Sequence, residues 1–130
     1  MRAMDDRLLA RLIAAGRVLF GAGCLFAPKL MFATPAKAAS GPMVWMLRAF
    51  GIRDIVLGAG ALQSLQSPDP DPTWVAFGAL ADTADVVSAL VTRDELGPSS
   101  LAATLAIAVP AALIGWKATI GLRRAEARLP

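Results

Sequence analysis

Four apolar stretches occupy nearly the whole of this 130-residue chain, and each is close to the length of a membrane-spanning helix. They cover about residues 8–28, 43–63, 74–92 and 101–121. A helix of about 20 apolar residues crosses the hydrocarbon core of a bilayer. The segments between the stretches are rich in proline, glycine and charge, which is typical of loops. We therefore predict a single all-α domain over residues 1–130, an integral membrane bundle of four transmembrane helices.

The composition agrees with a membrane protein and excludes several kinds of chemistry. Apolar residues make up 56% of the chain, and its mean hydropathy of +0.57 is high for a soluble domain. The chain has no His, no Tyr and one Cys, Cys24. Imidazole catalysis, an internal disulfide and a redox pair of cysteines are therefore excluded. We predict no metal and no cofactor, and we expect Cys24 to be a buried packing residue.

Basic residues beside the apolar stretches predict how the bundle is oriented. Three Arg lie in each terminal tail, whereas the first loop has Lys29 and Lys37 and the third loop has Arg93. Because cytoplasmic segments carry an excess of Lys and Arg, we expect both termini on the cytoplasmic side of the plasma (inner) membrane. Basic tails that flank apolar helices suit anionic lipid headgroups, so we expect a lipid bilayer as partner and no nucleic acid.

A cleaved signal peptide is the alternative interpretation of the first stretch. Basic residues precede it, and Ala36-Lys37-Ala38 resembles a small-residue cleavage site. Arg17, however, lies in the middle of the apolar run, where a signal peptide rarely carries a charge. We therefore favour a first span that the mature protein retains.

The feature that bears most on function is a set of charged residues inside the predicted spans. Each charge near the bilayer centre costs about 2.5 to 3.5 kcal/mol if it faces lipid. We therefore predict that these side chains face one another or water, as an intramembrane charge network or a candidate binding site. The six residues are Arg17, Arg48, Arg53, Asp54, Asp82 and Asp85.

Depth along the helices predicts two of the ion pairs. With a rise of about 1.5 Å per residue, Arg53 and Asp82 each lie about 15 Å from the outer boundary of their spans. By the same count Arg48 and Asp85 lie at about 8 and 10 Å. Since neighbouring spans run in opposite directions, we expect Arg53 to pair with Asp82 and Arg48 to pair with Asp85.

Arg17 and Asp54 are then left to pair with each other. Three Arg would balance three Asp in this arrangement, which argues against a free cation site. The helical angles fit less well, because Arg48 and Arg53 are about 140° apart around their helix. One of the two must therefore bend its long side chain around the helix.

Other residues indicate a compact bundle with interfacial anchors. Gly and Ala recur along the first, second and fourth stretches, and small residues let membrane helices approach closely. Pro110 lies inside the fourth stretch and predicts a kink there. Trp45, Trp74 and Trp116 lie near the predicted ends of spans, where tryptophan anchors helices at the membrane surface.

One sequence run resembles a known family. The run Arg48-Ala-Phe-Gly51-Ile-Arg53-Asp54-Ile-Val-Leu57-Gly58, followed by Trp74 and by Asp82-Thr-Ala-Asp85, is similar to the pattern of a small bacterial and fungal membrane family catalogued as domain of unknown function 4267. The resemblance covers residues 16–121. It implies a bundle of four membrane helices, and it implies no activity.

A second resemblance does not hold. Asp82-x-x-Asp85 is similar to the start of the metal-binding signature of the alcohol phosphatidyltransferases that synthesise phospholipids. Val86 stands where that signature needs Gly, and Leu90 stands where it needs Arg. No second pair of Asp follows, so a site for two metal ions cannot be completed.

Three classes of function fit these observations. We favour a structural or accessory subunit, with the bilayer and a larger membrane complex or a homo-oligomer as partners. The alternative is a transporter-like or ligand-binding bundle, in which Asp82 and Asp85 form a midplane site for a proton, a cation or an amphiphile. A membrane enzyme that acts on a lipophilic substrate is the third class, and the lack of catalytic residue types makes a non-enzymatic role the favoured one.

Overall fold

The computed structural model describes residues 2–31 and 40–127, and the regular structure within them is entirely α-helical. The predicted all-α fold is therefore confirmed. Lys37 and the possible cleavage site at residues 36–38 lie outside the described residues. The helices are α1 (Arg2–Phe26), α2 (Pro28–Met31), α3 (Gly41–Ser64), α4 (Thr73–Val91) and α5 (Arg93–Glu126).

Three of the described helices are long and apolar enough to cross a membrane. They are α1 from Asp5 onward, α4 and α5. The remaining long helix, α3, differs because every stretch of 18 residues within it contains Arg48, Arg53 and Asp54. The helices lie where the apolar stretches predict them, but two begin earlier than expected. Helix α1 includes the basic N-terminal segment, and α5 begins at Arg93 inside the predicted third loop.

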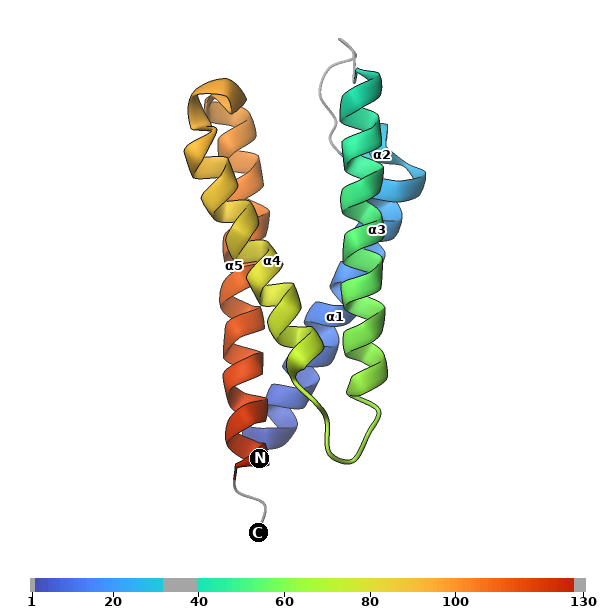
Figure 1. Ribbon diagram of the computed structural model, residues 1–130, viewed down its shortest axis with the longest axis vertical. Coiled ribbons are helices and arrows are strands. Elements are labelled where there is room, and N and C mark those ends of the chain that lie inside the picture. Colours follow the sequence, from blue (N-terminus) through green and yellow to red (C-terminus); the bar gives the residue numbers. More distant parts are fainter. Residues whose placement is uncertain (1, 32–39, 128–130) are drawn as a thin grey trace.

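The long helices are arranged as two pairs. Helix α1 packs mainly on α3, and α4 packs mainly on α5, while α1 also contacts α5 and α3 also contacts α4. Figure 1 shows the two pairs diverging toward one end of the molecule and coming together at the other. The start of α1, the loop between α3 and α4 and the end of α5 all lie at the end where the pairs meet (Figure 1).

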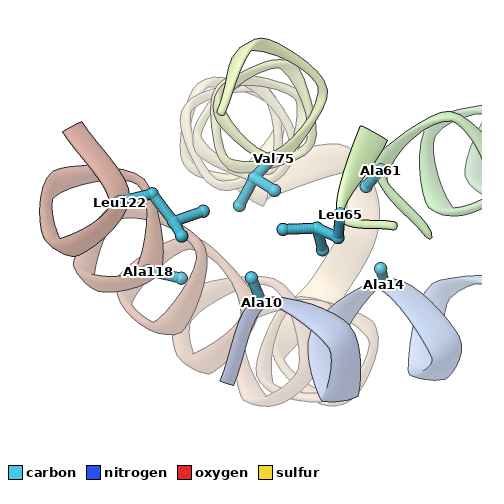
Figure 2. Close-up of a cluster of buried hydrophobic side chains, with 7 residues drawn as sticks. All are labelled: Ala10, Ala14, Ala61, Leu65, Val75, Ala118 and Leu122. Atoms are coloured by element: carbon cyan, nitrogen blue, oxygen red, sulfur yellow. The ribbon is translucent and has the colours of Figure 1, made fainter. Parts of the chain in front are cut away.

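A buried apolar cluster lies at that end and draws on all four long helices. Its side chains point toward a common centre from α1, from the C-terminal end of α3, from α4 and from α5 (Figure 2). Four of its seven members are alanines, so the helices can approach closely there. The cluster consists of Ala10, Ala14, Ala61, Leu65, Val75, Ala118 and Leu122.

Helices α1 and α3 meet at glycines. A Cβ atom added at Gly51 would lie 2.5 Å from the carbonyl oxygen of Gly21, and one added at Gly21 would lie 2.5 Å from the carbonyl oxygen of Gly51. Seven residues further along α3, a Cβ at Gly58 would lie 2.6 Å from the carbonyl oxygen of Ala14. The backbones of the two helices therefore touch at positions seven residues apart on each helix, which only small residues permit.

Helix α5 departs from the prediction at its kink. The backbone leaves helical geometry at Gly97, with φ 74° and ψ 163°, whereas it keeps helical angles at Pro110, where we predicted the kink. The angles at Gly97 belong to a region that glycine alone enters readily. Pro98 follows directly and begins the long continuous part of the helix, a position where its missing N–H costs no hydrogen bond.

Hydrogen bonds fix the loop between α3 and α4. Arg7 donates to the carbonyl oxygens of Ser67 and Pro68 at 2.7 and 2.8 Å. Asp71 accepts from the backbone N–H of Thr73 at 2.8 Å and from its hydroxyl at 2.6 Å, which ties the loop to the first turn of α4. These two hydrogen bonds hold the pKa of Asp71 below its ordinary value. The N-terminal parts of α1 and α4 are thus anchored to the same loop.

Candidate functional site

Arg17 of α1 lies at the centre of the buried charges. Its Nη1 donates to Oδ1 of Asp54 on α3 at 3.4 Å, and its Nη2 donates to Oδ2 of Asp82 on α4. All three residues are buried, with 8%, 4% and 5% of their surfaces exposed. A single guanidinium group therefore joins the α1 and α3 pair to α4, because its two nitrogens bind carboxylates on two different helices.

Glycines make room for this arginine. A Cβ atom at Gly78 would lie 2.8 Å from Nε of Arg17, and one at Gly58 would lie 3.1 Å from its Cβ. Gly78 precedes Asp82 by four residues, so the two share one face of α4. Gly78 was not predicted from the sequence to be part of the site. The spacing of Gly78 and Asp82 was the signal that could have found it.

Arg53 of α3 forms the second half of the network. Its Nη1 and Nη2 donate to the two oxygens of Asp85 on α4 at 2.9 and 2.7 Å, and its Nη2 also donates to Asp54 at 3.3 Å. The ring of Phe50 lies 4.2 Å from the guanidinium carbon, a cation–π contact. The side chains of Arg53 and Asp85 are 33% and 24% exposed, so this end of the network is more open than the end at Arg17.

The observed pairs agree with one of the three predicted pairs. Arg17 binds Asp54, as we expected. Arg53 binds Asp85 rather than Asp82, and Asp82 binds Arg17 instead. The predicted Arg53 pair is thus displaced by three residues, less than one turn of α4. Depth counted along a helix does not fix a partner more finely than a turn, since arginine is long enough to reach across that distance.

Arg48 lies outside the network. Its side chain is exposed, and among the described residues no carboxylate lies within 4 Å of it. The prediction that Arg48 pairs with Asp85 was therefore wrong. The physical reason is the angle of about 140° between Arg48 and Arg53, which places them on different sides of α3.

The network consequently contains more carboxylates than guanidinium groups. Two guanidinium groups face three carboxylates, and the chain of ion pairs runs Asp82, Arg17, Asp54, Arg53, Asp85. The expected balance of three Arg and three Asp does not occur, because Arg48 is absent from it. Among the described residues no cluster of three or more carboxylates and thiols is arranged to hold a metal ion.

Two cavities lie near the candidate residues. The first, beside Arg17, has a volume of about 10 Å³, which is space for about one water molecule. Its lining residues are Ile13, Ala14, Arg17, Leu57, Ala61, Trp74, Val75 and Gly115. The second, of about 200 Å³, lies where α1, α2 and α3 meet. It is lined by Phe26, Ala27, Pro28, Lys29, Leu30, Val44 and Arg48.

Two further side chains support the packing around the network. Cys24 is fully buried in α1, and a Cβ at Gly51 would lie 3.0 Å from its Cβ. Trp116 of α5 donates from its indole N–H to the hydroxyl of Thr83 on α4 at 3.0 Å. Thr83 directly follows Asp82, so this hydrogen bond holds α5 against the segment of α4 that carries the acidic residues.

Comparison of the chain with models of protein families, with curated proteins and with solved structures finds no match. Membership of the family catalogued as domain of unknown function 4267 therefore stays a prediction. The geometry of the helices, the charge network and the two cavities is therefore the basis for a proposed function.

Proposed function

We propose that this chain is an integral membrane protein with four spans, of which α3 is the second. Helix α3 has 24 residues and is about 36 Å long, enough to cross a hydrocarbon core of about 30 Å. Facing lipid, Arg53 and Asp54 would together cost about 5 to 7 kcal/mol. Their ion pairs support the proposal, because both side chains turn toward other charges rather than outward.

Arg48 is compatible with the same proposal. It lies seven residues after Gly41, about 10 Å from the start of α3. At that depth a long arginine side chain extends to the membrane surface and keeps its charge hydrated. An exposed Arg48 therefore does not prevent α3 from crossing the membrane.

The proposed orientation places both termini in the cytoplasm of a cell whose plasma (inner) membrane holds the protein. The end of the bundle where the helix pairs meet carries Arg7, Arg11, Arg123 and Arg124. Among the described residues the opposite end carries three, namely Lys29 of α2, Arg48 near the start of α3 and Arg93 at the start of α5. This difference supports the orientation, because cytoplasmic segments are the more basic ones.

Within the membrane, the protein serves as a structural or accessory subunit. The observation that carries this proposal is the position of Arg17, whose two ion pairs connect both helix pairs. The cavity beside it, about 10 Å³, has no room for a substrate. A network that joins helices and encloses almost no space suits a structural role better than catalysis or transport of an amphiphile.

A double-mutant cycle tests this role. Arg17→Gln and Asp82→Asn are each expected to destabilise the protein in detergent, because each leaves a buried partner uncompensated. The double variant should recover a large part of the loss, since both charges are then removed. If Asp82→Asn alone is as stable as the wild type or more so, the carboxylate is held at a cost to stability, and the structural role is contradicted.

A second candidate function follows from the excess of carboxylates over guanidinium groups in the network. Three carboxylates on α3 and α4 share two guanidinium groups, one each from α1 and α3, and α5 brings no charged side chain within 4 Å of them. An unbalanced carboxylate in low dielectric takes up a proton, so the network is a candidate proton site. Infrared spectroscopy tests it: a protonated carboxyl band at neutral pH that Asp82→Asn removes is expected, and its absence contradicts this function.

A further inference from the structure

The end of the bundle formed by α1, α2 and the start of α3 is entirely basic. From Arg7 to Arg53 the sequence contains no Asp and no Glu. Lys29 of α2 and Arg48 of α3 both lie in this part of the chain. Lys29 and Arg48 therefore have no carboxylate near them in the sequence, and among the described residues none lies within 4 Å of either side chain.

These two basic residues line the same cavity. Its volume of about 200 Å³ is several times the share of a water molecule in the liquid, about 30 Å³. Lys29 comes from the short helix after α1, and Arg48 comes from the second turn of α3, so two separate elements each contribute a basic residue to the lining of one cavity. A Lys and an Arg that line one cavity suit a phosphate group, because both can donate charge-assisted hydrogen bonds to its oxygens.

The remaining walls of the cavity are apolar. Phe26 and Leu30 stand at its edge with 79% and 80% of their surfaces exposed, and Val44 contributes a further aliphatic wall. Such large exposed apolar side chains beside two cations suit a ligand that has both an anionic group and a hydrocarbon part. A free anion would use the cations but would leave the apolar walls without a partner.

We propose that this cavity binds the phosphate group of an anionic phospholipid, with Lys29 and Arg48 on the phosphate and Phe26 and Leu30 against the lipid chains. The proposal depends on the membrane location argued above, but not on the structural role of the charge network. It also gives Arg48 a counter-ion at the depth where α3 would otherwise carry an uncompensated charge.

Lipid retention by the purified full chain tests the proposal. In a neutral detergent, native mass spectrometry should find phosphatidylglycerol bound about tenfold more than phosphatidylcholine with the same acyl chains, because the choline ammonium of the second lipid neutralises its phosphate and is repelled by the two cations. Arg48→Gln and Lys29→Gln should each remove this preference. Lys117→Gln, which changes an exposed lysine on α5, is the matched control and should keep it.

Two results separate the possible outcomes. If the preference for phosphatidylglycerol persists in excess inorganic phosphate, the ligand is a lipid. If bound lipid is lost while phosphate is retained at Lys29 and Arg48, the site takes a free anion, and the lipid assignment is overturned. Equal retention of the two lipids, or a preference that both variants keep, overturns the proposal entirely. Because both side chains are exposed, thermal melting should be unchanged in both variants, and either one alone suffices for the test.

Discussion

The contact between Gly21 and Gly51 makes a sharp prediction about how α1 and α3 pack. A methyl group at Gly51 would lie 2.5 Å from the carbonyl oxygen of Gly21, 2.9 Å from the backbone nitrogen of Leu25 and 3.0 Å from Cβ of Cys24. Two of these neighbours are backbone atoms, which cannot move unless the helix moves. Gly51→Ala must therefore force the two helices apart by a large fraction of an ångström.

The magnitude follows from two opposing effects. Overpacking a tight contact costs about 1 to 3 kcal/mol, and we expect the upper end because backbone faces backbone. Replacing Gly by Ala in a helix gains about 0.5 to 1 kcal/mol from reduced chain entropy. Gly51→Ala should therefore lose about 2 kcal/mol of unfolding free energy.

Gly16 supplies the matched control. It lies in α1, a Cβ there would meet nothing within 4 Å, and the residue is exposed. Gly16→Ala should thus be neutral or more stable than the wild type by up to about 1 kcal/mol. Because the chemical change is identical, the difference between the two variants, about 3 kcal/mol, isolates the steric cost at the helix contact.

Reversible unfolding in mixed micelles of a mild detergent and dodecyl sulfate, followed by circular dichroism, measures both variants. The structure predicts that Gly51→Ala unfolds at a lower fraction of dodecyl sulfate than the wild type and that Gly16→Ala does not. If the two variants are equally stable, the helices do not approach each other at Gly51, and the proposed contact between α1 and α3 is refuted.

Three other substitutions test separate parts of the fold. Arg17→Gln should lower the unfolding free energy by about 3 to 5 kcal/mol because it leaves buried carboxylates unpaired. Arg53→Gln, at a site one third exposed, should lower it by about 1 to 2 kcal/mol. Equal losses in the two variants would contradict this order. Asp71→Ala should lower the melting temperature at neutral pH, which is above the ordinary aspartate pKa of about 3.9. The difference from the wild type should close as the pH falls through the lowered pKa of Asp71. A difference in melting temperature that persists in acid would contradict the role of the carboxylate. Gly97→Ala should cost about 1 to 3 kcal/mol because alanine is strained at φ 74°, and an unchanged melting curve would rule out this backbone geometry.

The long helices could be predicted from the sequence because their signal is simple. Apolar stretches of about 20 residues separated by Pro and Gly place four long helices to within a few residues at most ends. The start of α5 could not be placed, since Arg93 and its neighbours are as polar as a loop. The kink at Gly97 depends on a backbone angle that hydropathy does not encode, so Pro110 was the more visible but incorrect choice.

The residues that form the candidate site could be predicted better than the ion pairs between them. Charged residues inside apolar stretches stand out, and five of the six lie in one network. Depth along a helix gives one coordinate only, whereas the partner of Asp82 depends on where α1 crosses α4. That crossing is made possible by Gly78, which leaves space for Arg17. The spacing of Gly78 and Asp82 shows that the two share a face of α4, but it does not show which helix packs on that face.

Arg48 is the predicted site residue that lies outside the network. Its charge within an apolar stretch suggested a partner among the acidic residues, but its angle on α3 turns it toward the cavity with Lys29. Helical angles were therefore a better guide than depth for this residue. The consequence is a network with one more carboxylate than guanidinium groups and, separately, a basic cavity at the end of the bundle.

The most direct test is to determine whether α3 crosses the membrane. Helix α3 is the helix whose charged side chains must be paired in the network if it is to lie in the bilayer. In a Cys24→Ala background, Ser40→Cys and Asp69→Cys place single thiols at exposed positions before and after α3. We predict that a membrane-impermeant maleimide labels the first variant in intact cells and labels the second only after the membrane is permeabilised. Labelling of both thiols from the same side would contradict a membrane-spanning α3 and the four-span bundle with it.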